Sequence, residues 1–196
     1  MASILEFKSA LLGGGARPNQ MRVELNFPGF VSGGSQAARK AQFLCTAASL
    51  PGSQIGIAPV YYRGREVKLA GERVFGNWVI NVINDTDFAI HQAFQDWTKQ
   101  INDPKENIGL TNPLLYTADM SVHHLDRNGA SIKQYKFADA WPVSVSDIQL
   151  DFSANDTIEM FQVELAYAFW EDSGSATAVS ATASISTPVG SIGISL

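Results

Sequence analysis

Hydrophobic and polar residues alternate along much of the chain with a period of two, which is the pattern of half-buried β-strands. In the first such run, residues 21–27, the apolar side chains are Met21, Val23, Leu25 and Phe27. Clusters of Pro, Gly and Ser separate most of the runs and are typical of turns. The pattern predicts a mainly β protein, with further strands at about residues 42–47, 57–63, 66–70, 73–84, 115–125 and 131–140.

The alternation is most regular near the end of the patterned region. In residues 147–152, Ile148, Leu150 and Phe152 alternate with polar residues, and residues 158–169 largely keep this period. The intervening Ser-Ala-Asn-Asp at 153–156 has the composition of a turn. Together these segments predict a long closing hairpin.

One segment has helical periodicity instead. Ile90, Phe94, Trp97 and Ile101 recur on one face of a helix predicted over residues 87–101. Asp or Thr side chains at 85–87 can cap its N-terminus, and Asn-Asp-Pro at 102–104 ends it. Many strands and one helix predict an antiparallel β-barrel or sandwich with one flanking α-helix, because closure of the sheet removes exposed edges.

Composition divides the chain into three parts. Residues 1–19 contain a Gly triplet and a Pro and are predicted to form a flexible lead. Residues 20–172 form the predicted β domain. Residues 173–196 hold no charged side chain and are rich in Ser, Ala, Thr and Gly. We expect disorder or an extended arm there, with a strand added to a neighbouring subunit as the alternative.

Charge and hydropathy limit the classes of function that the chain could have. Charged residues make up 17% of the 196 residues, below the usual quarter or so. This fits a surface largely covered by other protein, although the uncharged final segment also dilutes the average. The net charge of −5 gives no basic footprint for tight nucleic-acid binding. No run approaches the roughly 18 apolar residues of a membrane span, and we expect no Sec leader and no membrane insertion.

The residues that commonly carry chemistry form no recognisable catalytic group. Cys45 is the single cysteine and lies in an apolar run, which favours an inert thiol. His123 and His124 are adjacent, so on a strand they point to opposite faces and cannot readily share a metal. The acidic side chains around the closing turn lack EF-hand spacing and are interpreted as solvated charges. We therefore predict no enzyme activity, no metal and no cofactor.

Several stretches, read in order, resemble the tail tube protein family of contractile-tailed bacteriophages. The resemblance runs from residue 16 to residue 171, and no single stretch is diagnostic. The chain departs from the family in its final segment, residues 173–196, and in a longer linker at residues 32–40. The matching stretches are Ala-Arg-Pro-Asn at 16–19, Cys-Thr-Ala-Ala-Ser-Leu-Pro-Gly at 45–52, Leu-Ala-Gly-Glu-Arg-Val-Phe-Gly-Asn-Trp at 69–78, Phe-Gln-Asp-Trp at 94–97, Trp-Pro-Val at 141–143, Ile-Gln-Leu-Asp-Phe at 148–152, and Asn-Asp-Thr-Ile-Glu-Met-Phe-Gln-Val at 155–163, running to Phe-Trp-Glu at 169–171.

The resemblance implies a β-barrel with a flanking helix that assembles into hexameric rings stacked as a hollow tube. Such a tube lies inside the sheath and guides the genome out of the capsid. The implied partners are further copies of the chain, the tail sheath protein, the baseplate and tail terminator proteins, and double-stranded DNA in transit. The implied location is the virion tail, after assembly in the bacterial host cytoplasm.

Two groups of residues are candidates for the tube's surfaces. Polar residues of the first strand and closing hairpin are predicted to line the channel, where acidic and amide groups would repel DNA phosphate; the alternative is that they face sheath or solvent. These are Glu24, Gln149, Asp151, Gln162 and Glu164. The resemblance places a loop around residues 51–65 at the joint between rings, with glycines that give it freedom before assembly. Its residues are Pro51, Gly52, Gly56, Tyr61, Arg63 and Gly64.

Two other classes of function fit the same pattern. One is a tube subunit of a type VI secretion system or another contractile injection system, with a protein cargo. The other is a non-catalytic β-sandwich binding module, for which a monomer with a concave aromatic site is expected.

Overall fold

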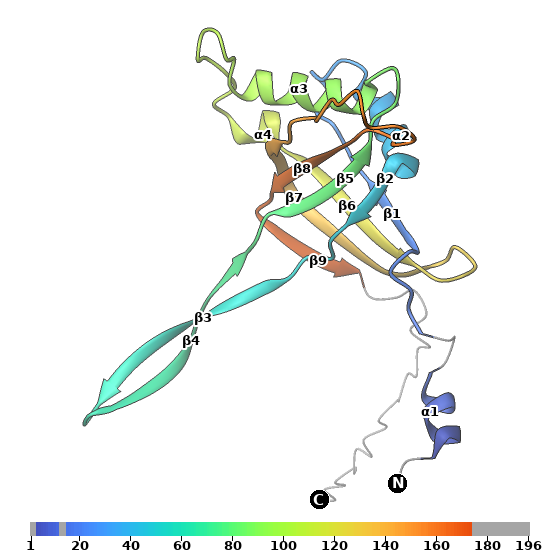
Figure 1. The fold of residues 1–196 in the computed structure, drawn as a ribbon. Coiled ribbons are helices and arrows are strands. Elements are labelled where there is room, and N and C mark those ends of the chain that lie inside the picture. Colours follow the sequence, from blue (N-terminus) through green and yellow to red (C-terminus); the bar gives the residue numbers. More distant parts are fainter. Residues whose placement is uncertain (1–2, 12–14, 174–196) are drawn as a thin grey trace, which may run out of the picture.

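The computed structural model describes residues 3–11 and 15–173. Figure 1 shows a strand-rich body, helices α2, α3 and α4 at one end of it, and a long hairpin that projects away from it. The elements in chain order are α1 (Ile4–Ala10), β1 (Met21–Glu24), α2 (Gly34–Leu44), β2 (Cys45–Ala48), β3 (Ser53–Tyr62), β4 (Arg65–Phe75), β5 (Trp78–Ile83), α3 (Ala89–Ile101), α4 (Pro113–Tyr116), β6 (Ala118–Leu125), β7 (Ser131–Val145), β8 (Met160–Ala166) and β9 (Phe169–Ser173).

The body is an antiparallel sheet folded around its longest strand, β7. The hydrogen-bonded order is β1-β6-β7-β8-β5-β2, with β9 also pairing β7. The first half of β7 lies between β6 and β9, and its second half pairs β8. In the short link between β8 and β9, the N–H of Ala168 donates to the carbonyl of Ala138 on β7 at 3.0 Å, which continues the pairing with β7. The two halves are named sheet A (β1, β6, β7, β9) and sheet B (β2, β5, β8, β7).

The space between the two sheets is the hydrophobic core. The inward residues of each strand are those of the alternating pattern, and Trp78 stacks on Phe137 with ring centroids 4.2 Å apart. This confirms the prediction of a mainly β, antiparallel barrel or sandwich. The core strands contribute Val23, Trp78, Ile80, Val82, Met120, Val122, Phe137, Phe161, Val163 and Leu165.

Helix α3 confirms the predicted helix and closes one end of the body. Ile90, Phe94 and Trp97 are buried, and the Phe94 ring lies edge-on to Phe27 with centroids 5.1 Å apart. The N-cap residue is Phe88, with a φ of 52° and no side-chain hydrogen bond, because a phenyl ring carries no acceptor oxygen. The nearby carboxylate of Asp87 accepts from the N–H of Ala89 at 3.2 Å.

Helix α2 corrects the sequence prediction of a linker at 32–40 and a strand at 42–47. Its buried residues are small, so the apolar face has little side-chain bulk and the helical period is weak. Gly34 packs so tightly that a Cβ there would lie 2.8 Å from the Cβ of Phe27. Only residues 45–47 of the predicted strand lie in strand β2, which ends at Ala48. The lead, predicted to be flexible, also contains a helix, α1.

The predicted closing hairpin is wrong. Residues 146–159 contain no strand, and both edges of β8 are occupied, one by β5 and the other by β7. A segment preceding β8 therefore has no edge to pair with, whatever its alternation. The strand predicted at 73–84 is likewise divided at Gly76-Asn77 into β4 and β5. The prediction for residues 174–196 lies outside the described residues, and Ser173 ends β9.

Candidate assembly surfaces

Strands β3 and β4 form a hairpin, here called the arm. Nine residue pairs join them, from Ser53–Phe75 to Tyr62–Arg65. Arg63 and Gly64 form the two-residue turn at its tip, with φ of 47° and 78°. Two positive φ values are the signature of a type I′ turn, whose twist matches that of the strands. The predicted inter-ring loop is therefore a rigidly paired hairpin in this structure.

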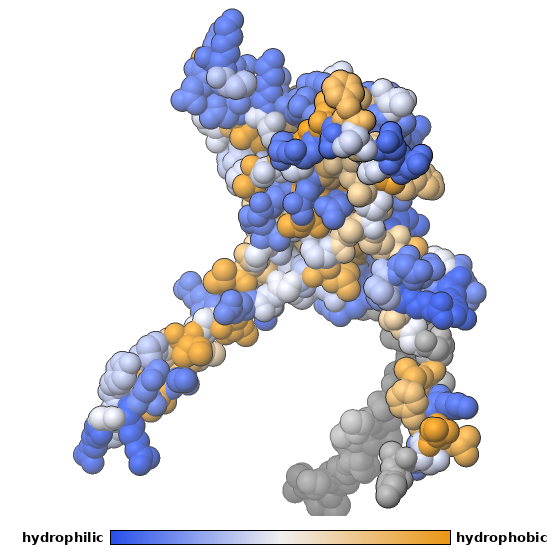
Figure 2. Space-filling view, viewed as in Figure 1, coloured by the Kyte–Doolittle hydropathy of each residue, from blue (hydrophilic) through white to orange (hydrophobic). Residues whose placement is uncertain are grey.

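Among the described residues, the contacts that tie the arm to the body lie at its base. The indole N–H of Trp170 donates to the Gly52 carbonyl at 3.3 Å, and Phe75 packs against the rings of Tyr167 and Trp170. Beyond the base, every arm residue from 53 to 74 is exposed. Figure 2 shows this projection, with apolar surface along the arm and hydrophilic surface at its tip.

The two faces of the arm differ. One face, here called the apolar arm face, presents Ala58 beside Leu69 and Val60 beside Val67. Val60, Val67 and Leu69 are about half exposed, at 48%, 47% and 52%. The opposite face places Pro59 beside Lys68 and Tyr61 beside Glu66. Ile57 and Ala70 also pair on this second face, which therefore mixes apolar and charged side chains. A hairpin with so much exposed apolar surface is marginal alone in water, which indicates a partner.

The six predicted joint residues are spread along the length of the arm. Pro51 and Gly52 lie at its base, and Tyr61, Arg63 and Gly64 lie at its tip. Gly56 is in the middle of β3 at a register shift, where a Cβ on the facing Gly71 would lie 3.0 Å from the Gly56 carbonyl oxygen. These glycines permit close backbone approach and a tight turn, rather than a flexible loop.

The five residues predicted to line a channel do not share one surface. Gln162 and Glu164 lie on the outward face of sheet B, where Gln162 is paired with Asn81. The Asn77 amide donates to the Glu164 carboxylate at 2.8 Å. Gln149 and Asp151 both lie in the segment between β7 and β8. Glu24 lies on sheet A.

Glu24 belongs to a compact polar group on the outward face of sheet A. Its carboxylate lies 3.2 Å from the Ser121 hydroxyl and 3.3 Å from Nε2 of His123. Ser121 and His123 are themselves buried, although they point away from the core. Lys136 and Glu171 sit opposite each other on the neighbouring strands, so this face carries charges of both signs.

The histidines follow the sequence prediction. His123 points to the outward face of sheet A, whereas Nε2 of His124 lies 2.9 Å from the Arg17 carbonyl. Cys45 is half-buried, and burial raises the pKa of its thiol to about 12. The described residues contain no group of three or more metal-ligating side chains, and none of their helices is long and apolar enough to cross a bilayer.

The segment joining β7 to β8, residues 146–159, was predicted as part of the closing hairpin with solvated acidic side chains, and it is instead an irregular loop. Within it, the large side chains of Leu150, Phe152 and Ile158 are exposed. Its four carboxylates have no Lys or Arg among them in the segment: Asp147, Asp151, Asp156 and Glu159. This segment is here called the acidic loop. The run of acidic residues was visible in the sequence, but the exposure of the large apolar side chains was not, because the predicted strand would have buried them.

The sequence resembles known tail tube proteins over most of its length. A family model described as phage tail tube protein matches residues 16–173. The tail tube protein gp19 of Enterobacteria phage T4 is 30% identical over 157 residues, which are 80% of this chain and 91% of that protein. The tail tube protein of Serratia phage KSP90 is 31% identical over 169 residues, covering 85% and 95%.

Solved structures share the fold at low sequence identity. A chain in the cryo-EM structure of the anti-feeding prophage baseplate superposes with a TM-score of 0.59 at 12% identity, over 82% of this chain and 96% of that one. A chain in the extended sheath–tube complex of the PVC extracellular contractile injection system gives a TM-score of 0.52 at 14% identity, over 89% and 99%.

Proposed function

The chain belongs to the phage tail tube protein family, and from this premise we propose that it forms hexameric rings that stack into a hollow tube for DNA. The observation that carries the proposal is the arm. It exposes apolar side chains far from the body, and a partner copy would bury them. The tube would be a virion component, assembled in the host cytoplasm, with sheath, baseplate and terminator proteins as partners.

Free strand edges support closure of a ring. Among the described residues, β1, β2 and β9 each have one edge with no strand partner. An unpaired edge is a template for pairing with another chain. In identical copies arranged around an axis, the free edge of each copy can pair with a different surface of the next copy. Such head-to-tail contacts form a closed ring when the rotation between neighbours divides a full turn evenly.

The outward face of sheet B fits the channel wall better than that of sheet A. Gln162, Glu164 and Asn81 give it amide and acidic groups without a basic side chain on β5 or β8. Sheet A instead carries Arg22 and Lys136, which would attract phosphate. Weak repulsion, acting over a Debye length of about 8–10 Å, lets DNA slide without adhering.

A phage tail tube and an injection-system tube differ in their cargo, which is DNA in the first and protein in the second. The relatives at 30% and 31% identity are phage tail tube proteins, whereas the injection-system chains share only the fold. A DNA-conducting phage tail is therefore the function we propose. Capsid and terminase genes beside the coding sequence would support it, and their absence would favour an injection system with a protein cargo.

Negative-stain electron microscopy of the purified protein, with its mass from light scattering, tests the assembly. The expected result is hollow rings or stacked tubes. A monomer at every concentration, even with a baseplate initiator supplied, would contradict the proposal and favour the binding-module alternative.

A further inference from the structure

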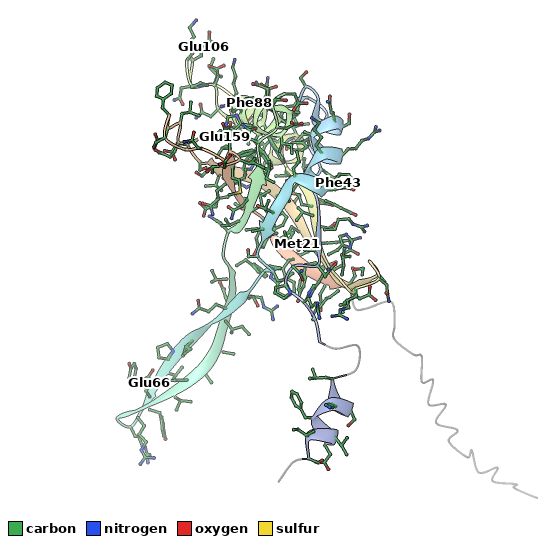
Figure 3. All side chains as sticks on the ribbon, turned by 45° about the vertical axis from the view of Figure 1, so that its right-hand side comes forward. Met21, Phe43, Glu66, Phe88, Glu106 and Glu159 are labelled. Atoms are coloured by element: carbon green, nitrogen blue, oxygen red, sulfur yellow. The ribbon has the colours of Figure 1, made fainter. Side chains whose placement is uncertain are left out.

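Two exposed surfaces of the subunit complement each other but lie at opposite ends of it. Figure 3 shows Glu66 near the tip of the arm and Glu159, in the acidic loop, at the helical end of the body. Neither surface can reach the other within one copy. Copies stacked along the line that joins these two ends would bring the arm of one copy to the acidic loop of the next.

The arm supplies apolar surface and positive charge. Its apolar face is formed by Ala58, Val60, Val67 and Leu69. Although the whole chain carries −5, the basic side chains of the arm outnumber the acidic ones by four to two. The basic side chains are Arg63, Arg65, Lys68 and Arg73.

The acidic loop supplies the matching surface. Leu150 is 84% exposed, Ile158 is 66% exposed, and Phe152 is fully exposed. Hydrogen bonds from the backbone N–H and the hydroxyl of Ser153 lower the pKa of Asp151, which favours its charged form. Exposed aromatic and aliphatic groups surrounded by charge of one sign are typical of a protein interface.

We propose that the apolar arm face of one copy packs on the acidic loop of a copy in the adjacent ring. Leu150 and Phe152 would cover the apolar pairs of β3 and β4, while Arg65, which pairs with Tyr62 on the same face, meets the loop's carboxylates. The contact is heterologous, so it propagates along an axis instead of closing on itself. It rests on the proposed function and deepens it, because it names the surface that receives the arm.

Cysteine cross-linking in assembled tubes tests the contact. The double variant Val60→Cys/Phe152→Cys is assembled and mildly oxidised, and its products are separated without reductant. Native Cys45 can remain, since its pKa of about 12 leaves little thiolate near neutral pH. We expect a ladder of covalent oligomers in tubes, with each single variant giving no ladder. Ala58→Cys/Leu150→Cys is a second pair on the same two surfaces.

The matched control is Val60→Cys/Leu114→Cys. Leu114 is as exposed as Leu150, at 82%, but lies on α4. A ladder from this control, or no ladder from either loop pair in intact tubes, would overturn the arm–loop contact while leaving the tube function standing. Failure of wild-type protein to form tubes at all would instead remove the proposed function, and the inference with it.

Discussion

At the residue scale, the fold rests on side chains that alternate into a single core. Val163 and Leu165 point inward from β8, whereas Gln162 and Glu164 between them point outward. This two-residue period was readable from the sequence, and it correctly separated core from surface on β1 and β8. The sequence could not show which outward face meets solvent, DNA or another copy, because the same polar residues suit all three.

Truncating a core residue should destabilise the subunit far more than truncating the arm. Leu165→Ala leaves a cavity at a fully buried position, and its expected cost is about 2–5 kcal/mol. Val60→Ala on the half-exposed arm should cost less than about 0.5 kcal/mol in unassembled protein. Urea denaturation of dilute subunits measures both. Equal losses would mean that the arm is part of the cooperative core.

An ion cluster joins helix α2 to the residues that precede α3. The ammonium of Lys40 bonds the carboxylates of Asp85, at 2.6 Å, and of Asp87. The hydrogen bonds that the Lys40 ammonium donates to Asp85 and Asp87 lower the pKa of both carboxyl groups and raise the pKa of Lys40.

The ion cluster should stabilise the fold at pH values between the ordinary pKa of aspartate, 3.8, and the ordinary pKa of lysine, 10.5. Lys40→Met should therefore lower the unfolding midpoint at pH 7. The difference from wild type should shrink as acid protonates the carboxylates through their lowered pKa values. Thermal unfolding at pH 7 and pH 2.5 measures it, with Arg39→Met, an exposed neighbour, as the control. A difference independent of pH would show that Lys40 acts through packing.

At the element scale, sequence pattern succeeded where side chains are large and the period is long. Helix α3 was predictable because bulky Ile90, Phe94 and Trp97 recur on one face. Helix α2 was not, because Ala37 and Ala41 form its buried face and a small side chain gives little signal. The acidic loop alternates like a strand, but pairing requires a free edge, and β8 has none.

Removing the arm should separate folding from assembly. Antiparallel β2 and β5 already lie side by side, so residues 53–75 can be replaced by a short Gly-Ser turn. We expect the shortened subunit to keep a melting temperature within a few degrees of that of the unassembled wild-type subunit, and to form no tubes. Calorimetry and electron microscopy measure the two effects. Tubes of normal length from this variant would show that the arm is dispensable for stacking.

At the scale of the whole molecule, we propose that sheet B lines the channel, that the arm crosses the ring boundary and that the acidic loop binds the arm of the next copy. The sequence predicted the β fold, but it described the arm as a loop around residues 51–65 and ran one strand through its base at 73–84. It grouped Glu24, Gln149 and Asp151 with the sheet B residues only because all are polar members of alternating runs. In the folded chain, Glu24 lies on sheet A, whereas Gln149 and Asp151 lie in the acidic loop and the remaining two lie on sheet B.

Positive charge on the channel wall should slow DNA passage without blocking assembly. The double variant Gln162→Lys/Glu164→Lys should give particles of normal appearance with at least about a tenfold lower infectious titre per particle, because lysines bind phosphate. Glu24→Lys, on sheet A, is the control and should have little effect on ejection. If the control lowers the titre and the sheet B variant does not, sheet A lines the channel.

A cryo-EM map of the wild-type tube is the most direct test of the central claim. The account predicts stacked rings in which β3 and β4 cross into the neighbouring ring, with Gln162 and Glu164 facing the lumen. An arm folded back onto its own ring, or a lumen lined by another surface, would contradict it.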